Sequence, residues 1–336
     1  MSFRILHPLY EAASLIWTDE GIGNQLHLQG GETREQWQRS PLHLLHSNQL
    51  PFLRRRLVGR NAQLDFPLLQ DLKETGGTDY LCLGVPFQSD WNEGVLSSWL
   101  TDRPRGFTDG HLRDIRSVMQ PLAYALKSRI ERQIAENIAS AYLGRTAGER
   151  VLSGAIRRGD GERISGALWY SDLRGSTALA ERLTPEDFLA ALNAYFDRSA
   201  QAILEQGGEV ISYIGDGVLG FFPDSEDPAS ACKQALAAAK KAAPALGQGS
   251  RGEQPFTVAL HYGSFIYGNI GTADRLQFTA IGSSINELAR IQDLTKSLGE
   301  PLLASGPFTE KAGGDWRGLG EHKVRGLDHA LPLFTL

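Results

Sequence analysis

The stretch Ala167-Leu168-Trp169-Tyr170-Ser171-Asp172-Leu173-Arg174-Gly175-Ser176-Thr177 decides the fold of the second half of the chain. It begins as a short apolar strand that ends on the carboxylate of Asp172, and a glycine turn follows. Ser176 and Thr177 come next, and either hydroxyl could cap a new helix. A carboxylate at a strand end can hold a hard cation, while the free amides of a first helical turn face the phosphates that the cation carries. An ordinary strand–turn–helix junction is an equally good reading of this stretch alone.

A second carboxylate favours the cation reading. Residues 208–222 contain two apolar strands joined by Gly215-Asp216-Gly217, in which glycines supply the positive φ of a tight hairpin turn. This places Asp216 at a hairpin tip, where Asp172 on a neighbouring strand could reach the same ion. Two carboxylates with one or two Mg²⁺ ions are a recurring arrangement for in-line displacement at phosphorus.

Length and composition set the outer limits. The 336 residues leave room for two domains, and the hydrophobic content of 41% is enough for packed cores. A net charge of −5 gives no reason to expect a nucleic-acid partner. The only cysteines, Cys82 and Cys232, favour a reducing compartment over a disulfide scaffold. The N-terminus lacks a signal-peptide layout and no apolar run approaches the ~20 residues of a membrane helix, so we expect a cytoplasmic protein without a membrane span.

The remaining back half alternates helices and strands. Thr184-Pro185-Glu186-Asp187 has the cap, the N1 proline and the acidic first turn of a helix that Gly207-Gly208 ends. Further expected elements are helices at 229–243 and 284–298, strands at 256–261 and 330–336, and a loop at 247–254. Helices over a sheet that includes a hairpin predict an α+β sandwich.

Three motifs together resemble the signature of class III nucleotidyl cyclases. They are residues 170–177 (YSDLRGST), 214–217 (IGDG) and 279–290 (TAIGSSINELAR), in the family's order. The resemblance implies a ferredoxin-like α+β catalytic domain at residues 161–336, with a mixed sheet covered by helices. It also implies a head-to-tail homodimer with two equivalent sites across the interface.

The activity that this resemblance implies is conversion of ATP to 3′,5′-cyclic AMP and pyrophosphate with two Mg²⁺ or Mn²⁺ ions per site. The residues implied are the metal ligands Asp172, Asp216 and the carbonyl of Leu173; the phosphate-binding Arg174, Gly175, Ser176, Thr177 and Arg325; and the catalytic Asn286 and Arg290.

Asn286 and Arg290 are spaced i and i+4, so they share one helix face. By the resemblance Asn286 orients the ribose. The rigid fork of an arginine suits charge developing on the α-phosphoryl oxygens, which a lysine would not reproduce. The alternative is a capping-region asparagine and a solvated arginine.

Base selection is where the sequence departs from the family. Ser212 stands where adenine-selecting members usually have a lysine, whereas Thr279 matches the partner position. A serine lacks the reach and the charge of lysine, so we expect a loosened or altered base preference. ATP is the expected substrate, and GTP or a pyrimidine triphosphate is the alternative. A catalytically retired nucleotide-binding signalling module is a further alternative.

The front half resembles a GAF-type α/β sensor domain at residues 1–128. Strands at 80–87 and 94–100 precede a long helix that begins after Phe107-Thr108-Asp109, and Pro121 should kink that helix or mark a fresh start. Such a domain would bind an unidentified small-molecule effector or serve only for dimerisation. The candidate lining residues are Trp37, His43, His46, Arg54, Arg55 and Arg56, for which packing or solvated surface is the commoner explanation.

Between the two parts, residues 129–160 are expected to form a helical dimerising linker. The helical pattern breaks at Gly144, Gly154, Gly159 and Gly161. The linker would either transmit a change from the sensor or remain a passive connection.

Overall fold

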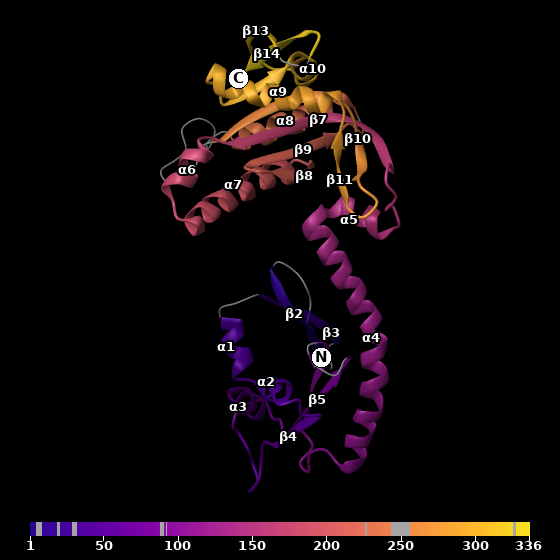
Figure 1. The fold of residues 1–336 in the computed structure, drawn as a ribbon. Coiled ribbons are helices and arrows are strands. Elements are labelled where there is room, and N and C mark those ends of the chain that lie inside the picture. The colour runs from indigo at the N-terminus through magenta and orange to yellow at the C-terminus, as the bar shows by residue number, and fades with distance from the viewer. Residues whose placement is uncertain are drawn as a thin grey trace. The chain divides into compact units, whose positions relative to one another are not determined.

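The computed structural model describes residues 1–4, 9–18, 21–28, 32–87, 91, 93–225, 227–242, 256–324 and 327–336. The chain forms two compact units, Met1–Tyr142 and Leu143–Leu336 (Figure 1). The division falls inside the stretch expected to be a linker, and the segment after Tyr142 belongs to the second unit. Among the described residues, none of the helices combines the length and the apolar character needed to cross a bilayer.

The first unit is built on an antiparallel sheet of strand order β3-β2-β1-β6-β5-β4. Its strands are β1 Ser2–Arg4, β2 Tyr10–Thr18, β3 Gly21–Leu28, β4 Phe52–Arg56, β5 Asp79–Pro86 and β6 Gly94–Thr101. Its helices are α1 Glu32–Gln38, α2 Pro41–Ser47, α3 Pro67–Glu74 and α4 Asp109–Leu143, the last of which ends one residue into the second unit. The two strands expected in this half are confirmed as β5 and β6.

Strand β5 explains how the sheet is covered on both faces. Tyr80 and Cys82 pack in a cluster with residues of α2 and α3, whereas Leu81 and Leu83 pack with Met119 and other residues of α4. Successive side chains of a strand point to opposite faces, so a continuous apolar run is what a strand covered on both faces requires.

Helix α4 begins as expected and continues through Pro121, where a kink or a fresh start was expected. The hydroxyl of Thr108 accepts a hydrogen bond from the backbone N–H of His111 at 3.2 Å, which caps the helix. The helix runs through Pro121 without a fresh start, so that part of the prediction is wrong. Met119 and Ala123 are buried on either side of the proline. Proline has no backbone N–H, so the helix lacks one hydrogen bond at Pro121, and the packing of these two side chains supports the helix there.

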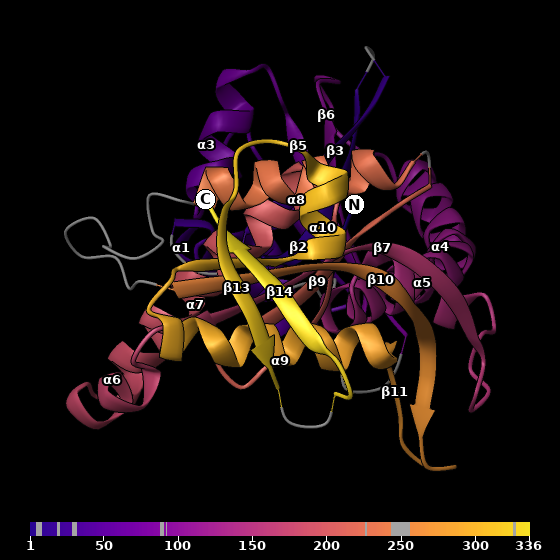
Figure 2. The same cartoon turned by 90° about the horizontal axis from the view of Figure 1, so that it is seen from above.

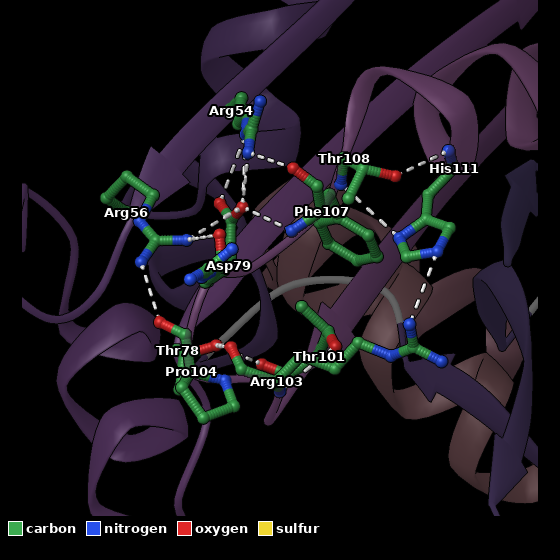
Figure 3. A network of polar contacts seen from close by, with 11 residues as sticks. Arg54, Arg56, Thr78, Asp79, Thr101, Arg103, Pro104, Phe107, Thr108 and His111 are labelled. Carbon is green, nitrogen blue, oxygen red and sulfur yellow. Dashed lines mark hydrogen bonds and ion pairs between the residues drawn. The ribbon is translucent and has the colours of Figure 1, made fainter.

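The segment that leads into α4 is fixed by a buried carboxylate (Figure 3). Asp79 is fully buried and pairs with Arg54 at 2.6 Å and with Arg56 at 3.4 Å. It also accepts a hydrogen bond from the backbone N–H of Phe107 at 2.9 Å. Arg56 in turn donates to the carbonyl of Arg105 at 2.8 Å. Two strands of the sheet thereby hold the chain just before α4.

The second unit is built on a mixed sheet of order β13-β14-β12-β10-β7-β9-β8, with β11 paired to β10. Its strands are β7 Gly161–Leu173, β8 Glu209–Ile214, β9 Gly217–Pro223, β10 Phe256–Gly271, β11 Leu276–Ile281, β12 Leu302–Ser305, β13 Arg317–Lys323 and β14 Ala330–Thr335. Its helices are α5 Arg145–Leu152, α6 Ser176–Arg182, α7 Pro185–Glu205, α8 Pro228–Ala242, α9 Ser283–Leu298 and α10 Gly306–Ala312. β10 and β12 run parallel, whereas the other pairs are antiparallel. The expected α+β architecture is confirmed.

Helices cover both faces of this sheet, and Figure 2 shows α8 and α9 on opposite sides of it. Trp169 of β7 packs in the cluster that contains residues of α7, α8 and α10. Leu168, its neighbour in sequence, packs in the cluster that contains residues of α9. The alternation of strand side chains therefore assigns odd-numbered residues of β7 to one face and even-numbered residues to the other.

The start and the end predicted for the helix between Thr184 and Gly208 are confirmed. The hydroxyl of Thr184 accepts a hydrogen bond from the N–H of Asp187 at 3.2 Å, and Pro185 opens α7. The helix ends before Gly207, whose φ of +81° lies in the region that favours glycine. The helices expected at 229–243 and 284–298 and the two later strands are confirmed as α8, α9, β10 and β14. The loop expected at 247–254 lies outside the described residues.

Candidate active site

Asp172 and Asp216 meet at one end of the sheet. Asp172 is the second-last residue of β7 and pairs in register with Gly217, the first residue of β9. The N–H of Leu173 donates to the backbone carbonyl of Asp216 at 3.3 Å. The hairpin turn is Gly215-Asp216, with Gly215 at φ +61°. The prediction of a hairpin tip beside a strand-end carboxylate is confirmed.

Gly217 lets the two strands approach this closely. A Cβ at this position would lie 2.6 Å from the Tyr170 ring and 3.1 Å from the carbonyl of Ser171. The first distance is too short for any real Cβ, so a larger residue would require the Tyr170 ring or the strand backbone to shift. The Gly-Asp-Gly motif thus serves both the turn and the spacing of the carboxylates.

Lys296 of α9 pairs with one of these carboxylates. Its Nζ lies 2.9 Å from Oδ2 of Asp172, whose side chain is 16% exposed. Burial raises the pKa of Asp172, the bond from Lys296 opposes that shift, and the negative charge of Asp216 adds to it. The same hydrogen bond raises the pKa of Lys296, and the charges of Asp172, Asp216 and Asp293 contribute. Sequence reasoning missed Lys296, since it lies on an exposed helix position far along the chain.

This arrangement fits a divalent cation. The charge of Asp216 acts on Asp172, and the Lys296 ammonium stands against Asp172 as a cation would. No group of three or more acidic, histidine or cysteine side chains is assembled for a metal among the described residues. Mg²⁺ typically takes one or two protein carboxylates and fills its shell with phosphate and water oxygens, so two are enough.

The opposite face of β7 is held by a buried hydroxyl cluster. The hydroxyl of Ser171 lies 2.9 Å from the Tyr195 hydroxyl and 2.7 Å from that of Ser199, both on α7. All three residues are buried. The sequence signal for this cluster was a serine and a tyrosine four residues apart on the buried face of a predicted helix. The cluster fixes the strand directly beside Asp172.

The turn after Asp172 differs from the expectation. Gly175, with φ +69°, is the residue that precedes α6, and no side chain caps this helix. Ser176 is already the first helical residue, so the prediction that Ser176 or Thr177 caps the helix is wrong. The left-handed glycine turns the chain by itself and leaves no room for a separate capping residue. Phosphate binding by Arg174 to Thr177 stays a prediction.

Asn286 and Arg290 lie on the exposed side of α9, one turn apart. Arg290 pairs weakly with Asp293 at 3.4 Å. Within the described part of this chain, neither residue makes a hydrogen bond or ion pair with Asp172 or Asp216. One chain therefore assembles the carboxylates with Lys296, and leaves Asn286 and Arg290 facing outward.

A buried histidine of β10 lies close to the start of α9. His261 of β10 shares a hydrogen bond of 2.8 Å with the hydroxyl of Ser305, and its Nε2 lies 3.6 Å from a carboxylate oxygen of Glu287. Burial lowers the pKa of His261 to about 4, so the ring is neutral near pH 7 and this approach is not an ion pair. Glu287 is the neighbour of Asn286 on α9, so His261 lies close to the segment that carries Asn286.

Ser212 and Thr279 come from strands that lie against each other, β8 and β11. A bulge between Val210 and Ser212 shifts the register of β8, and Ser212 then pairs with Leu219. The Ser212 hydroxyl is buried and has no hydrogen-bond partner among the described residues. Thr279 is 9% exposed. A buried hydroxyl without a partner is a group that a bound ligand can satisfy.

The candidate effector residues of the first unit serve its own structure. Arg54 and Arg56 pair with Asp79, and Arg55 pairs with Asp65 at 2.9 Å. The rings of His43 and His46 pack edge-on against Trp37 with centroids 5.6 and 6.0 Å away, and His46 contacts the carbonyl of Trp91. These contacts favour the packing explanation. Arg325 lies outside the described residues.

Comparison with known proteins agrees with this geometry, although no family model matches the chain. Adenylate cyclase 1 of Rhizobium meliloti (strain 1021) is 29% identical over 176 residues, which cover 50% of this chain and 26% of that protein. An adenylate cyclase of Anabaena cylindrica is 29% identical over 150 residues, covering 40% and 28%. The chain thus spans about a quarter of the length of these relatives. A bacterial light-regulated adenylyl cyclase structure aligns with a TM-score of 0.53 and 21% identity over 65% of each chain.

The second unit is similar in sequence to adenylate cyclases and in fold to an adenylyl cyclase structure, and the expected resemblance to class III nucleotidyl cyclases is confirmed.

Proposed function

We propose that residues 143–336 form a class III nucleotidyl cyclase domain that converts ATP to 3′,5′-cyclic AMP and pyrophosphate. One observation carries this proposal: Asp172 and Asp216 share the end of one sheet, and Asp172 is already paired with the positively charged Lys296. Mg²⁺ or Mn²⁺ is the cation expected here, at two ions per site.

Asp172 and Asp216 would hold the cations, and the carbonyl of Leu173 would add one oxygen. When bound, the cations supply charge neutralisation on the phosphates and a lowered pKa for the ribose 3′-hydroxyl. The backbone of Arg174 to Thr177 binds the β- and γ-phosphates in this proposal, and Arg325 adds a further positive charge.

Arg290 would stabilise the negative charge that develops on the α-phosphoryl oxygens, with Asn286 orienting the ribose. Both residues are exposed, and within the described part of the chain neither contacts its own Asp172 or Asp216. A second copy related by a twofold axis would present its Arg290 to the first copy's carboxylates, and the reverse. We therefore propose a head-to-tail homodimer with two equivalent sites.

Base choice rests on Ser212 and Thr279. The Ser212 hydroxyl, which has no partner in the described part of the chain, can donate or accept one hydrogen bond to a base edge, whereas a lysine would only donate. ATP is the proposed substrate on the similarity to adenylate cyclases. The same hydroxyl favours GTP or a pyrimidine triphosphate as the alternative, because it imposes no single donor pattern.

The direct test is to incubate purified protein with Mn²⁺ and each of the four nucleoside triphosphates and to separate the cyclic products chromatographically. We expect cyclic AMP as the main product, and Asp172→Asn protein as an inactive control. No cyclic product from any nucleotide would overturn the proposal. ATP-dependent thermal stabilisation without turnover would instead identify a retired nucleotide-binding module.

We further propose that the first unit regulates the second. Its support is the direct continuation of α4 into Gly144 and α5, which belong to the second unit. An Asp79→Ala substitution tests this, because it disturbs the contacts ahead of α4 without touching the second unit. An unchanged cyclase rate in a folded Asp79→Ala protein would contradict regulation through α4.

A further inference from the structure

Lys296 has no part in the proposed chemistry, yet it makes the shortest charged contact in the site. Its Nζ lies 2.9 Å from Oδ2 of Asp172. The contact joins the exposed side of α9 to the end of β7, two elements that pack together on one face of the sheet. Asp172 points to that face, since it shares the parity of Leu168 and Tyr170 along β7.

The two partners of this ion pair differ in their freedom to move. The side chain of Asp172 is 16% exposed and belongs to a strand paired on both edges. The side chain of Lys296 is 64% exposed and stands near the C-terminus of α9. A lysine head on a flexible four-carbon stem can leave a contact without any backbone change. Of the two, Lys296 is the group that can be exchanged for another cation.

The surroundings supply a second place for the displaced ammonium group. Asp293 lies one turn before Lys296 on α9, with a side chain 71% exposed. Its charge already contributes to the raised pKa of Lys296. Residues three apart on a helix are neighbours, so the lysine can turn toward Asp293 when it leaves Asp172.

We propose that Lys296 is the built-in counterion of Asp172 in the metal-free protein and that a divalent cation must displace it to enter the site. The inference rests on the proposed role of Asp172 as a metal ligand. Without the lysine, the two carboxylates would lie close together and lose the positive charge that Lys296 supplies, and like charges in a half-buried site repel. With it, the metal-free site is neutralised and the cation has a competitor.

The test measures metal binding and not turnover. Mn²⁺ binding is titrated calorimetrically, without nucleotide, to the full-length wild type and to Lys296→Met, which keeps the stem and removes the charge. We expect the variant to bind Mn²⁺ about two- to fivefold more tightly, the range that a partly exposed ion pair allows. Lys240→Met removes the same charge from α8, on the other face of the sheet, and should leave Mn²⁺ affinity unchanged.

Thermal unfolding without metal gives the second readout. Lys296→Met should lower the melting temperature, and the shift should become smaller in an Asp172→Asn background, where Lys296 has lost its ion-pair partner. Unchanged Mn²⁺ affinity together with a lowered melting temperature would overturn the proposal and leave Lys296 as a structural contact only. The proposal would also be overturned if Lys296→Met lowered the melting temperature equally in the wild-type and the Asp172→Asn backgrounds.

These outcomes separate the inference from the proposed function. A protein that binds Mn²⁺ and makes a cyclic nucleotide, but whose Mn²⁺ affinity ignores Lys296, refutes the counterion role alone. A protein whose wild-type and Asp172→Asn forms bind Mn²⁺ equally refutes the metal site itself.

Discussion

Two inactive variants should restore each other when mixed, because each proposed site takes its carboxylates from one chain and its arginine from the other. Asp172→Asn removes a metal ligand, and Arg290→Ala removes the donor for the developing charge. Loss of one such preorganised donor costs about 10²–10³-fold in rate. Each variant alone forms dimers in which both sites are damaged.

In a mixed dimer the two defects fall into the same site. The Asp172→Asn chain contributes an intact Arg290 to its partner's intact carboxylates, so one site of the two is complete. Random pairing at equal concentrations makes half of all dimers mixed, so the mixture should recover about a quarter of wild-type activity. The assay is cyclic nucleotide production at a fixed total concentration, with dimer content measured by light scattering.

The matched control mixes Asp172→Asn with Asp216→Asn. Both changes damage the carboxylate pair, so every site in every dimer lacks one ligand and no recovery is expected. If the first mixture stays as inactive as its parents while forming dimers, the sites are built within single chains and the reasoning from the outward-facing Arg290 is wrong.

Three further outcomes follow from the buried polar groups. Because burial lowers the pKa of His261 to about 4, from 6.5, the unfolded state takes up a proton first as pH falls. The neutral His261 therefore stabilises the folded state above pH 6.5, and this stabilisation is lost toward pH 4, with about 2 kcal/mol lost by pH 5. In urea unfolding, the free energy of unfolding of His261→Gln should fall less steeply as the pH is lowered than that of the wild type. Asp79→Ala should destabilise the first unit by about 3–5 kcal/mol because it strands two arginines, whereas Asp65→Ala, at the exposed pair, should cost under about 1 kcal/mol in thermal unfolding. Ser212→Lys should raise the ratio of ATP to GTP turnover, and an unchanged ratio would contradict its assignment to base selection.

The parts of the site that local sequence determines could be predicted. The Gly215-Asp216-Gly217 turn and the apolar run ending at Asp172 each encode their own conformation, and their pairing follows from strand geometry. The cap at Thr184 is local in the same way. The cap predicted after Asp172 failed because a left-handed glycine and a capping hydroxyl are alternative ways to start a helix, and Gly175 was available.

The parts that depend on distant contacts could not be predicted. Lys296 occupies an exposed helix position like many other lysines, and only the packing of α9 on the sheet brings it to Asp172. The bulge in β8 leaves no mark in sequence that distinguishes it from a regular strand. In the first unit, β2 and β3 pair across a sequence with glycines at 21 and 23, which weakens a strand signal.

The hydroxyl cluster behind β7 has a consequence for how this protein tolerates change. Ser171 and Asp172 are adjacent, but their side chains lie on opposite faces of β7. The Ser171 side chain is enclosed by Tyr195 and Ser199, whereas the Asp172 side chain lies on the face that carries Lys296. A substitution on α7 that enlarges or empties that enclosure will displace the peptide unit shared by both residues. Positions that never meet the nucleotide should therefore prove as intolerant to mutation as those that do, and a search for inactive variants confined to the visible site would miss them.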